Sequence, residues 1–282
     1  MVSVLRPDGE QASQRSTPNA DSTAALFDVS PLLSAAGFKH AFFTRIGGVS
    51  QFPLDSLNVA AGATGDDPAA VRENVRRCAA ALGVRLEQLY FVSQIHSTDA
   101  VIIDGSEDRD EVVERKADIT ASRVSGVACA VRSADCVSVL LGDRRSGAVV
   151  AAHSGWRGTV ANVVSAGVEV MRSLAPSPSI IAAIGPHIET CCFEVGEDVA
   201  RDLASASSAG PSVIDRSFAK PHVNLRRVIR AQLVSAGVDD ASIDDVPGCT
   251  VCNVERYFSF RRDADKSGRM LAAIVARSGA TP

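Results

Sequence analysis

Residues 133–158 read SADCVSVLLGDRRSGAVVAAHSGWRG, and this stretch indicates how the chain folds. It holds two apolar, strand-forming runs, at 137–141 and 148–152, on either side of the polar turn GDRRSG. Two such runs joined by a glycine-bearing turn predict an antiparallel hairpin. We therefore expect Cys136, just before the first strand, and His153, just after the second, to meet at one edge of a sheet.

Strand and helix signals alternate on both sides of the hairpin. Asp67 and Pro68 predict the start of a helix, residues 89–95 predict a strand with 100–103 as its partner, and 104–116 predicts a polar loop. Further strands are expected at 41–44, 127–131, 180–184 and 270–276, and further helices at 160–171, 197–206 and 223–236. The alternation without a long linker indicates an α/β (α+β) fold in which helices cover mixed sheets.

The two ends of the chain differ in character. Residues 1–24 are rich in Ser, Gln, Thr and Pro and poor in large apolar side chains, which predicts a flexible N-terminal tail. We expect residues 25–279 to form a single catalytic domain, because no linker interrupts the pattern of strands and helices.

Composition narrows the class of protein. The chain has 282 residues, 46% of them hydrophobic, and nearly balanced charge, with 29 basic and 33 acidic residues. This balance argues against a broad basic surface for nucleic acid and against a polybasic membrane patch. No apolar run approaches the roughly 20 residues that span a bilayer. We therefore expect a cytoplasmic globular protein with neither nucleic acid nor a membrane as its partner.

Three residues at the expected strand ends could hold a metal ion. His96 follows the strand at 89–95, and Cys136 and His153 flank the hairpin. Two imidazoles and one thiolate leave a fourth tetrahedral position for water, as in catalytic zinc sites, where zinc lowers the pKa of that water toward neutrality. The alternative is that Cys136 is a packed core thiol and both histidines are ordinary loop residues. The three residues are far apart in the sequence, so no fixed ligand spacing distinguishes the two interpretations.

The same residues also allow a cysteine-nucleophile hydrolase. Cys136 would attack the substrate, His153 would act as its base, and Asp135 would orient the imidazole. This hypothesis leaves His96 without a role. A third hypothesis is a non-enzymatic scaffold that binds a partner or a structural metal through these residues.

An anion site is predicted directly after His153. The sequence GWRG at 155–158 opens a helix, where free amides, the helix dipole and the Arg157 guanidinium would together favour phosphate. Arg45 and Arg261 are further candidates for contacting substrate oxygens, and Phe260 for lining a pocket around a flat base. The ordinary alternatives are a glycine turn, solvated surface arginines and a core aromatic.

Four other cysteines form two close pairs in the sequence. Cys249 and Cys252 have the spacing of half a zinc knuckle or of a redox pair. Cys191 and Cys192 make a poor second half, because we expect adjacent side chains to diverge. In a long cytosolic chain such thiols are rarely disulfides. We interpret all four as mostly structural.

Seven motifs follow one another in the chain: TRIGGVS at 44–50, SLN at 56–58, QIH at 94–96, ADC at 134–136, AHSGWRG at 152–158, CCFEVG at 191–196 and FSFRRD at 258–263. In these motifs, and over about residues 38–276, the chain resembles the YfiH-like family. This family is also called the laccase-domain or multicopper polyphenol oxidase family, and its members are now viewed as purine nucleoside phosphorylases.

The resemblance implies a four-layer α/β/β/α sandwich with zinc on His96, Cys136 and His153. It also implies phosphorolysis of adenosine, inosine and methylthioadenosine together with adenosine deamination, so that a purine nucleoside and phosphate are the expected partners. We expect a monomer or small homo-oligomer.

Two groups of residues are expected to act at this site. Catalytic roles are expected for Asp135, Cys136, His153 and Arg157, and substrate contacts for Arg45, Asn58, Gln94, Arg157, Phe260 and Arg261. The carboxylate that moves the proton in deamination stays open between Asp135 and Glu194.

Five positions depart from the family pattern: Ser97, Ser138, Ser154, His187 and Asn224. None removes a proposed ligand, but they leave substrate preference open. Composition disfavours a true multicopper laccase, because a blue-copper centre with an adjoining copper cluster needs many imidazoles and the chain has five histidines. Copper in the zinc site could give only a weak polyphenol oxidase activity.

Overall fold

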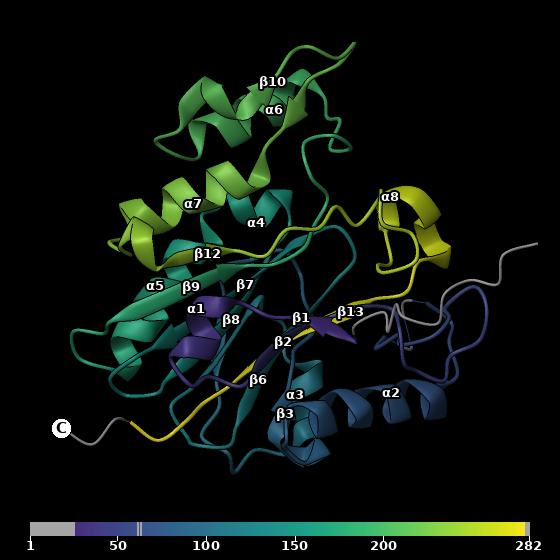
Figure 1. Ribbon diagram of the computed structural model, residues 1–282, viewed down its shortest axis with the longest axis vertical. Helices are drawn as coiled ribbons and strands as arrows, with labels where there is room; N and C mark the ends of the chain where they lie inside the picture. Colours follow the sequence, from purple (N-terminus) through teal and green to yellow (C-terminus); the bar gives the residue numbers. More distant parts are fainter. Residues whose placement is uncertain (1–25, 61, 63, 280–282) are drawn as a thin grey trace, which may run out of the picture.

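The computed structural model describes residues 26–60, 62 and 64–279, so the tail expected at 1–24 lies outside the described residues. Two large sheets form the centre of the molecule (Figure 1). The five-stranded sheet has the order β1 (Phe27–Asp28), β2 (His40–Phe43), β13 (Met270–Val275), β6 (Ala128–Ser133) and β3 (Leu89–Tyr90). The six-stranded sheet has the order β12 (Ile243–Asp245), β9 (Ile180–Ile184), β7 (Val137–Asp143), β8 (Val149–Ser154), β5 (Ile119–Ser122) and β4 (Ala100–Ile102).

Helices and a small ribbon complete the architecture. The helices are α1 (Pro31–Ala35), α2 (Pro68–Ala81), α3 (Arg109–Glu114), α4 (Trp156–Val160), α5 (Val163–Leu174), α6 (Glu197–Ser205), α7 (Leu225–Ser235) and α8 (Phe260–Asp263). The short strands β10 (Ile214–Asp215) and β11 (His222–Val223) pair with each other. Both large sheets contain parallel and antiparallel neighbours, which confirms the expected mixed α/β fold.

The predicted hairpin is confirmed as β7 and β8. The strands are antiparallel, with Ser138 opposite His153 and Gly142 opposite Val149. All residues of both strands are buried, because helices cover one face of their sheet and the other sheet covers the second face. Cys136 therefore enters β7 at the same edge of the sheet where His153 leaves β8.

Alternating side chains of the strands build three stacked cores. In β7, Val139 and Leu141 pack with residues of α5 and α7, while Leu140 between them packs with the five-stranded sheet. In β6, Val131 faces the six-stranded sheet and Ala130 faces α2. Three cores separate four layers, with α5 and α7 on one side of the strands and α2 on the other (Figure 1). The four-layer sandwich is thus confirmed.

Helix α2 forms where the sequence predicts it. The Asp67 side chain caps the helix by accepting the amide of Ala69, and Pro68 occupies the first helical turn. Gly83, at φ 70°, follows the last turn in the left-handed conformation that glycine tolerates. The buried residues Val71, Val75 and Cys78 place one face of this helix against the five-stranded sheet.

The single helix expected at 160–171 is instead two helices. Asn162 adopts a left-handed conformation, with φ 62°, between α4 and α5. Periodicity alone missed this break because Asn can adopt that conformation at modest cost, and the apolar spacing continues across it.

Two strand predictions were wrong in extent or pairing. β3 spans only Leu89–Tyr90, because the side chain of Gln94 bonds the backbone N–H and C=O of Arg132, where a longer strand would have used its own backbone. β4 pairs in parallel with β5 in the other sheet rather than with β3. The loop predicted at 104–116 contains the short helix α3, which Asp108 caps.

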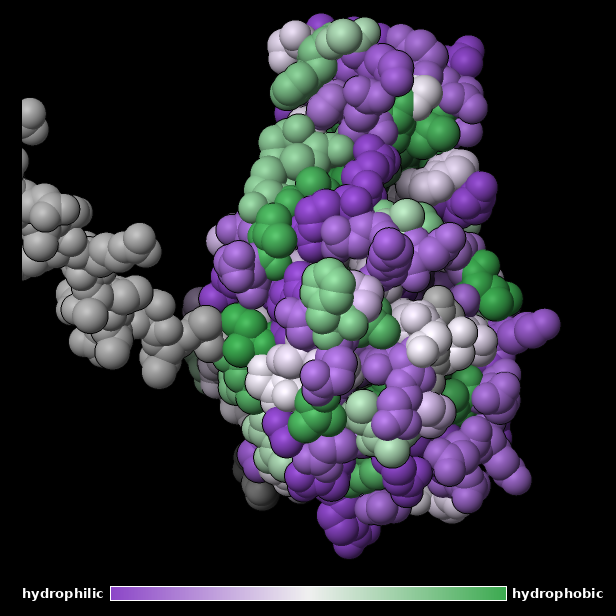
Figure 2. Space-filling view, turned by 90° about the vertical axis from the view of Figure 1, so that its right-hand side faces the viewer, coloured by the Kyte–Doolittle hydropathy of each residue, from purple (hydrophilic) through white to green (hydrophobic). Residues whose placement is uncertain are grey.

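The face of the molecule shown in Figure 2 is mostly polar. On the face shown in Figure 2, hydrophilic residues predominate and hydrophobic residues occur in small separate groups. None of the helices in the described part of the chain is long and apolar enough to cross a bilayer.

Candidate metal centre and arginine-lined cavity

The side chains of His96, Cys136 and His153 meet at the edge of the six-stranded sheet. Their potential ligand atoms lie within 4.8 Å of one another. His153 is the penultimate residue of β8, Cys136 directly precedes β7, and His96 lies in the segment that follows β3. His153 is buried whereas His96 is exposed, so the cluster opens to solvent on one side.

A buried carboxylate connects two of these residues. Asp118 is fully buried just before β5, and its Oδ1 lies 2.8 Å from Nδ1 of His153. Its Oδ2 accepts the backbone amides of Ile95, at 3.0 Å, and Ser97, at 2.6 Å. Because these two amides flank His96, one carboxylate fixes the ring of one histidine and the backbone of the other.

The backbone around the cluster is held in unusual conformations. His96 and Asp135 have φ of 62° and 82°, in the left-handed region that non-glycine residues rarely adopt. Gly155 leaves necessary space on the other side, since a Cβ there would lie 2.4 Å from His96 Nδ1 and 3.1 Å from Cys136 Sγ. The local backbone is therefore shaped around these side chains.

The pKa values of the two histidines are shifted in opposite directions. Burial alone would lower the pKa of His153, but Cys136 and Asp118 outweigh it and raise that pKa to about 9. Burial and the neighbouring His153 lower the pKa of His96. Burial raises the pKa of Asp118, but the hydrogen bond from His153 and those from the two amides lower it overall, so the carboxylate is ionised.

The donor set fits a catalytic zinc ion. Two imidazoles and a thiolate are suitable zinc ligands, and three ligands leave one coordination position open. Asp118 supplies the carboxylate partner that metal-binding histidines commonly have on their second nitrogen. The space beside Gly155 keeps His96 and Cys136 free of a Cβ that would crowd them.

A cavity of about 1060 Å³ opens beside the cluster and includes all three of these residues in its wall. This volume is slightly above the ~300–1,000 Å³ typical of small-molecule sites. Six arginines line the cavity: Arg72, Arg109, Arg132, Arg157, Arg261 and Arg269. Aromatic side chains also line it: Phe91, Phe193, Phe260 and Trp156. Guanidinium groups and aromatic faces together suit an anion beside a flat ring.

The six arginines outnumber the three carboxylates of the lining, Asp110, Glu114 and Asp135, so the wall of the cavity carries net positive charge. Burial, together with the charges of Arg269 and Arg109, lowers the pKa of Arg132 to about 10. Among the described residues, only Arg109 of the six pairs with a carboxylate within 4.0 Å. An anion bound here would relieve the repulsion between unpaired charges.

Four predicted substrate contacts do line the cavity: Gln94, Arg157, Phe260 and Arg261. The Gln94 amide is already engaged, since its oxygen and nitrogen each lie 2.8 Å from the backbone of Arg132. Gln94 thus positions Arg132. Arg157 is exposed and lies over the ring of Trp156, with 4.3 Å from its Cζ to the ring centroid.

Two predicted contacts lie outside the lining of this cavity. Arg45 donates to the carbonyls of Asp55 and Val254 and stacks over Phe258. Asn58 is fully buried, and its side chain accepts the backbone amide of Arg269 at 2.9 Å. Both residues order the loops that carry cavity residues instead of facing the cavity themselves.

The two carboxylates considered for proton transfer are differently placed. Asp135 lines the cavity, but its oxygens accept the Thr250 hydroxyl and the backbone amide of Arg261, each at 2.6 Å. Glu194 lies outside the lining, exposed and paired with Lys220 at 2.8 Å. Asp135 therefore connects the ADC motif to the FSFRRD motif.

The helix that begins in the GWRG sequence is short. The GWRG sequence opens α4, which has only five residues, so few peptide dipoles align behind its N-terminus. The positive potential of the cavity comes from its arginines instead.

Sequence reasoning missed Asp118, Arg132 and Arg269 as site residues. Asp118 carried a signal, because an acidic residue beside the apolar start of a strand is buried only when it is paired. Arg132 lies in a strand, near the ADC motif, and carried a similar signal. Arg269 carried none, because only the tertiary fold brings it to the cavity.

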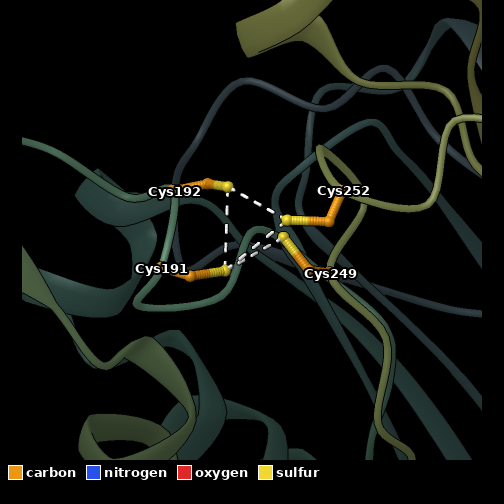
Figure 3. A group of neighbouring side chains, drawn as sticks. All are labelled: Cys191, Cys192, Cys249 and Cys252. Atoms are coloured by element: carbon orange, nitrogen blue, oxygen red, sulfur yellow. Dashed lines mark hydrogen bonds between the residues drawn. The ribbon is translucent and has the colours of Figure 1, made fainter.

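The expectation that Cys191 and Cys192 diverge was wrong. Figure 3 shows both thiols turned toward Cys249 and Cys252, and all four sulfurs lie within 4.8 Å of one another. The loop after β9 is turned so that both side chains face the loop after β12, an arrangement that sequence adjacency does not reveal.

Comparison with known proteins places these features in context. Residues 39–277 match the family described as multi-copper polyphenol oxidoreductase laccase. A purine nucleoside phosphorylase of Streptomyces griseus is 41% identical over 235 residues, which cover 83% of this chain and 92% of that protein. An adenosine deaminase from an unknown prokaryotic organism is 36% identical over 221 residues, which cover 76% and 84%.

The fold also matches solved structures. The crystal structure of YlmD from Geobacillus stearothermophilus gives a TM-score of 0.81 at 31% identity, covering 90% of this chain and 99% of that one. The region matched to the family contains the three-residue cluster and the six arginines of the cavity.

Proposed function

Because the chain belongs to the multi-copper polyphenol oxidoreductase laccase family, the YfiH-like family of its sequence motifs, we propose that it is a purine nucleoside phosphorylase that also deaminates adenosine. One observation carries the proposal. The metal-type cluster and the arginine-lined wall belong to a single cavity large enough for a nucleoside and a phosphate together.

In phosphorolysis, the arginines hold phosphate against the nucleoside. A phosphate oxygen attacks the anomeric carbon of the ribose, and the bond to the purine breaks with its electron pair leaving on the base. Arg132, Arg157 and Arg261 supply guanidinium groups that bind the dianion and hold it in position. The aromatic side chains of Phe193 and Phe260 line the space proposed for the base.

In deamination, the same cavity holds the purine beside the cluster of His96, Cys136 and His153. His96, Cys136 and His153 would hold a zinc ion, which would supply the Lewis acidity that hydrolytic deamination needs. Asp118 holds the His153 ring in a fixed tautomer and orientation, with Nδ1 engaged and Nε2 left for the metal. The position of Asp135 beside Cys136 supports a structural role for its carboxylate, since both oxygens already accept hydrogen bonds.

Zinc suits this site better than a set of coppers. The other three histidines of the chain, His40, His187 and His222, are each hydrogen-bonded through Nδ1 to backbone carbonyls away from the cluster. A multicopper centre needs more imidazoles than the two that converge here. We therefore assign no laccase chemistry to the native metal site.

A direct test separates the two activities. The purified protein is incubated with adenosine with and without phosphate, and the products are separated by chromatography. We expect adenine and ribose 1-phosphate only with phosphate, and inosine in both buffers. Absence of both products in both buffers would refute the proposed function.

A second candidate, a cysteine hydrolase, is favoured by one contact. Asp118, His153 and Cys136 form an acid–imidazole–thiol series like that of cysteine-dependent enzymes. It differs from the sequence prediction in that Asp118, and not Asp135, orients the imidazole. Under this alternative, chelation would leave turnover intact and alkylation of Cys136 would abolish it. Loss of turnover on chelation, restored by zinc, would reject it.

A further inference from the structure

Four cysteines outside the cavity converge from two loops. Cys191 and Cys192 lie between β9 and α6, and Cys249 and Cys252 lie between β12 and α8 (Figure 3). β9 and β12 are parallel neighbours, so both loops leave the same edge of the sheet. His187 continues this pairing beyond the strands, since its N–H donates to Gly248 and its carbonyl accepts the amide of Thr250, each at 3.0 Å.

The sulfur positions form a compact four-cornered group. The distances from Cys191 Sγ to the sulfurs of Cys192 and Cys249 are both 3.7 Å, and the distance to that of Cys252 is 3.8 Å. Cys192 and Cys252 are 3.4 Å apart. Four thiolates at a zinc–sulfur distance of about 2.3 Å would lie about 3.8 Å apart along the edges of a tetrahedron. The three distances from Cys191 match that figure closely, and the distance between Cys192 and Cys252 is somewhat shorter.

We propose that these four cysteines bind a structural zinc ion, separate from the metal of the cavity. The four thiols lose their protons as their thiolates occupy all four coordination positions, which leaves none for a substrate. The C-x-x-C spacing of Cys249 and Cys252 supplies one half of the site, and the vicinal pair Cys191 and Cys192 supplies the other.

Other uses of four thiols fit the geometry less well. A disulfide joins two sulfurs at about 2.05 Å and favours discrete pairs, whereas Cys191 is almost equally distant from three partners. An iron–sulfur cluster spreads its cysteine ligands over several metal atoms. All four sulfurs lie within 4.8 Å of one another, as binding to one ion requires.

The backbone around Cys249 supports a charged thiolate at that position. Backbone amides of Glu189, Val251 and Cys252 donate to the Cys249 sulfur. A zinc ion with four thiolates carries net negative charge, and the Arg261 guanidinium lies close by, with Nη1 3.2 Å from the carbonyl of Cys192.

The ion would hold together the two loops that form one wall of the cavity. Phe193, which lines the cavity, directly follows Cys192, and Thr250, which donates to Asp135, directly follows Cys249. Arg261 also donates to the carbonyl of Glu194 at 3.0 Å. The zinc thus positions Phe193, Arg261 and Asp135 without touching the substrate. This inference does not depend on the proposed function.

Metal counting tests the site. The full-length protein is purified with a phosphine reductant and without chelators, and zinc and iron per chain are measured by mass spectrometry. We expect Cys252→Ser to lose one equivalent of zinc relative to the wild type, and Cys136→Ser to lose a different equivalent from the cavity. Cys78→Ser, at a buried thiol of α2 that belongs to neither group, is the matched control and should equal the wild type.

A second measurement uses the wild type and needs no variant to fold. Cys191 and Cys252 are exposed, so free thiols there would be alkylated rapidly. We expect zinc to protect them until a chelator is added, with intact mass showing reduced thiols. Cobalt substitution should give the ligand-field spectrum of a tetrahedral tetrathiolate, which Cys252→Ser should lose. Unchanged zinc in Cys252→Ser, iron in place of zinc, or alkylation equally fast with and without chelator would overturn the proposal.

Discussion

Asp118 Oδ1 lies 2.8 Å from His153 Nδ1, and this contact couples two separate segments of the chain. The second oxygen of the same carboxylate holds the amides on either side of His96. One buried side chain therefore orients two of the three proposed metal ligands, although it does not belong to the ligand set itself.

Replacing Asp118 with Asn should weaken metal binding. The amide group of Asp118→Asn cannot accept from two backbone amides and from His153 at once, and it carries no charge to stabilise the ligand. Loss of such a supporting group typically costs 10–100-fold in metal affinity. Competition with a chromogenic chelator measures this change. Asp99→Asn, at a neighbouring exposed position, is the control, and equal affinities in both variants would contradict the role of Asp118.

Adding one methyl group at Gly155 should disrupt the cluster without unfolding the protein. The backbone at Gly155 has φ −69°, which alanine adopts easily, so the effect of Gly155→Ala is steric. Its Cβ would lie 2.4 Å from His96 Nδ1. We expect zinc loss and at least tenfold slower deamination with little change in melting temperature.

Gly158→Ala provides the matched control in the same motif. A Cβ at Gly158 would meet its nearest neighbour, a Val163 methyl carbon, at an ordinary 3.4 Å. Alanine in place of glycine inside a helix adds up to about 1 kcal/mol of stability. Retained zinc in both variants would show that the space beside Gly155 is not needed by the ligands.

Removing the Arg157 guanidinium should raise the KM for phosphate. A hydrogen bond to a charged group contributes about 1.5–3 kcal/mol, which corresponds to about 12- to 140-fold. Initial rates at varied phosphate measure the effect in Arg157→Ala, while deamination without phosphate should change far less. Arg216→Ala, which removes an exposed ion pair with Glu197, is the control. An unchanged KM for phosphate would remove Arg157 from the phosphate site.

Stability should fall as the pH drops below about 6.5, in part because of His40. Burial lowers the pKa of His40 from the ordinary 6.5 in the folded state. The unfolded chain therefore binds a proton at a higher pH than the folded protein does, and the folded state loses stability as the pH falls from 6.5 toward the folded pKa. Urea unfolding at pH 7.5 and 5.5 measures the loss.

His40→Gln should show a smaller loss between these two pH values. Its free energy of unfolding at pH 7.5 will be lower than that of the wild type, because His40 accepts the amide of Ser30 at 2.7 Å and bonds the carbonyl of Phe38. The comparison therefore uses the change with pH within each protein. Parallel changes in both would assign the pH dependence to other groups.

Much of the fold could be predicted because local signals agree with it. The hairpin of β7 and β8 and the helix α2 each carry their own turn, cap and apolar pattern. The pairing of β4 could not be predicted, because its neighbour β5 lies beyond helix α3 in the sequence. The shortness of β3 depends on a side chain, Gln94, that replaces backbone pairing with β6.

The candidate site was only partly accessible from the sequence. The motifs identified the three candidate metal ligands together, namely His96, Cys136 and His153. Two arginines that also belong to motifs, Arg157 and Arg261, do line the cavity. Arg45 and Asn58 belong to equally specific motifs, yet they face other loops. A motif marks a constrained residue, but it does not say whether substrate or protein imposes the constraint.

The sequence by itself determined the residue types of both thiol-containing groups and the strands that carry them. Period-two apolar runs and glycine turns are local properties, so they could be recognised without coordinates. Only the tertiary structure decided that Asp118 connects His96 to His153, that six arginines from distant segments share one cavity, and that the sulfurs of four cysteines lie within 4.8 Å of one another. These relationships depend on the packing of loops at the ends of paired strands, where distances of a few ångströms determine which groups can bind the same ion or substrate.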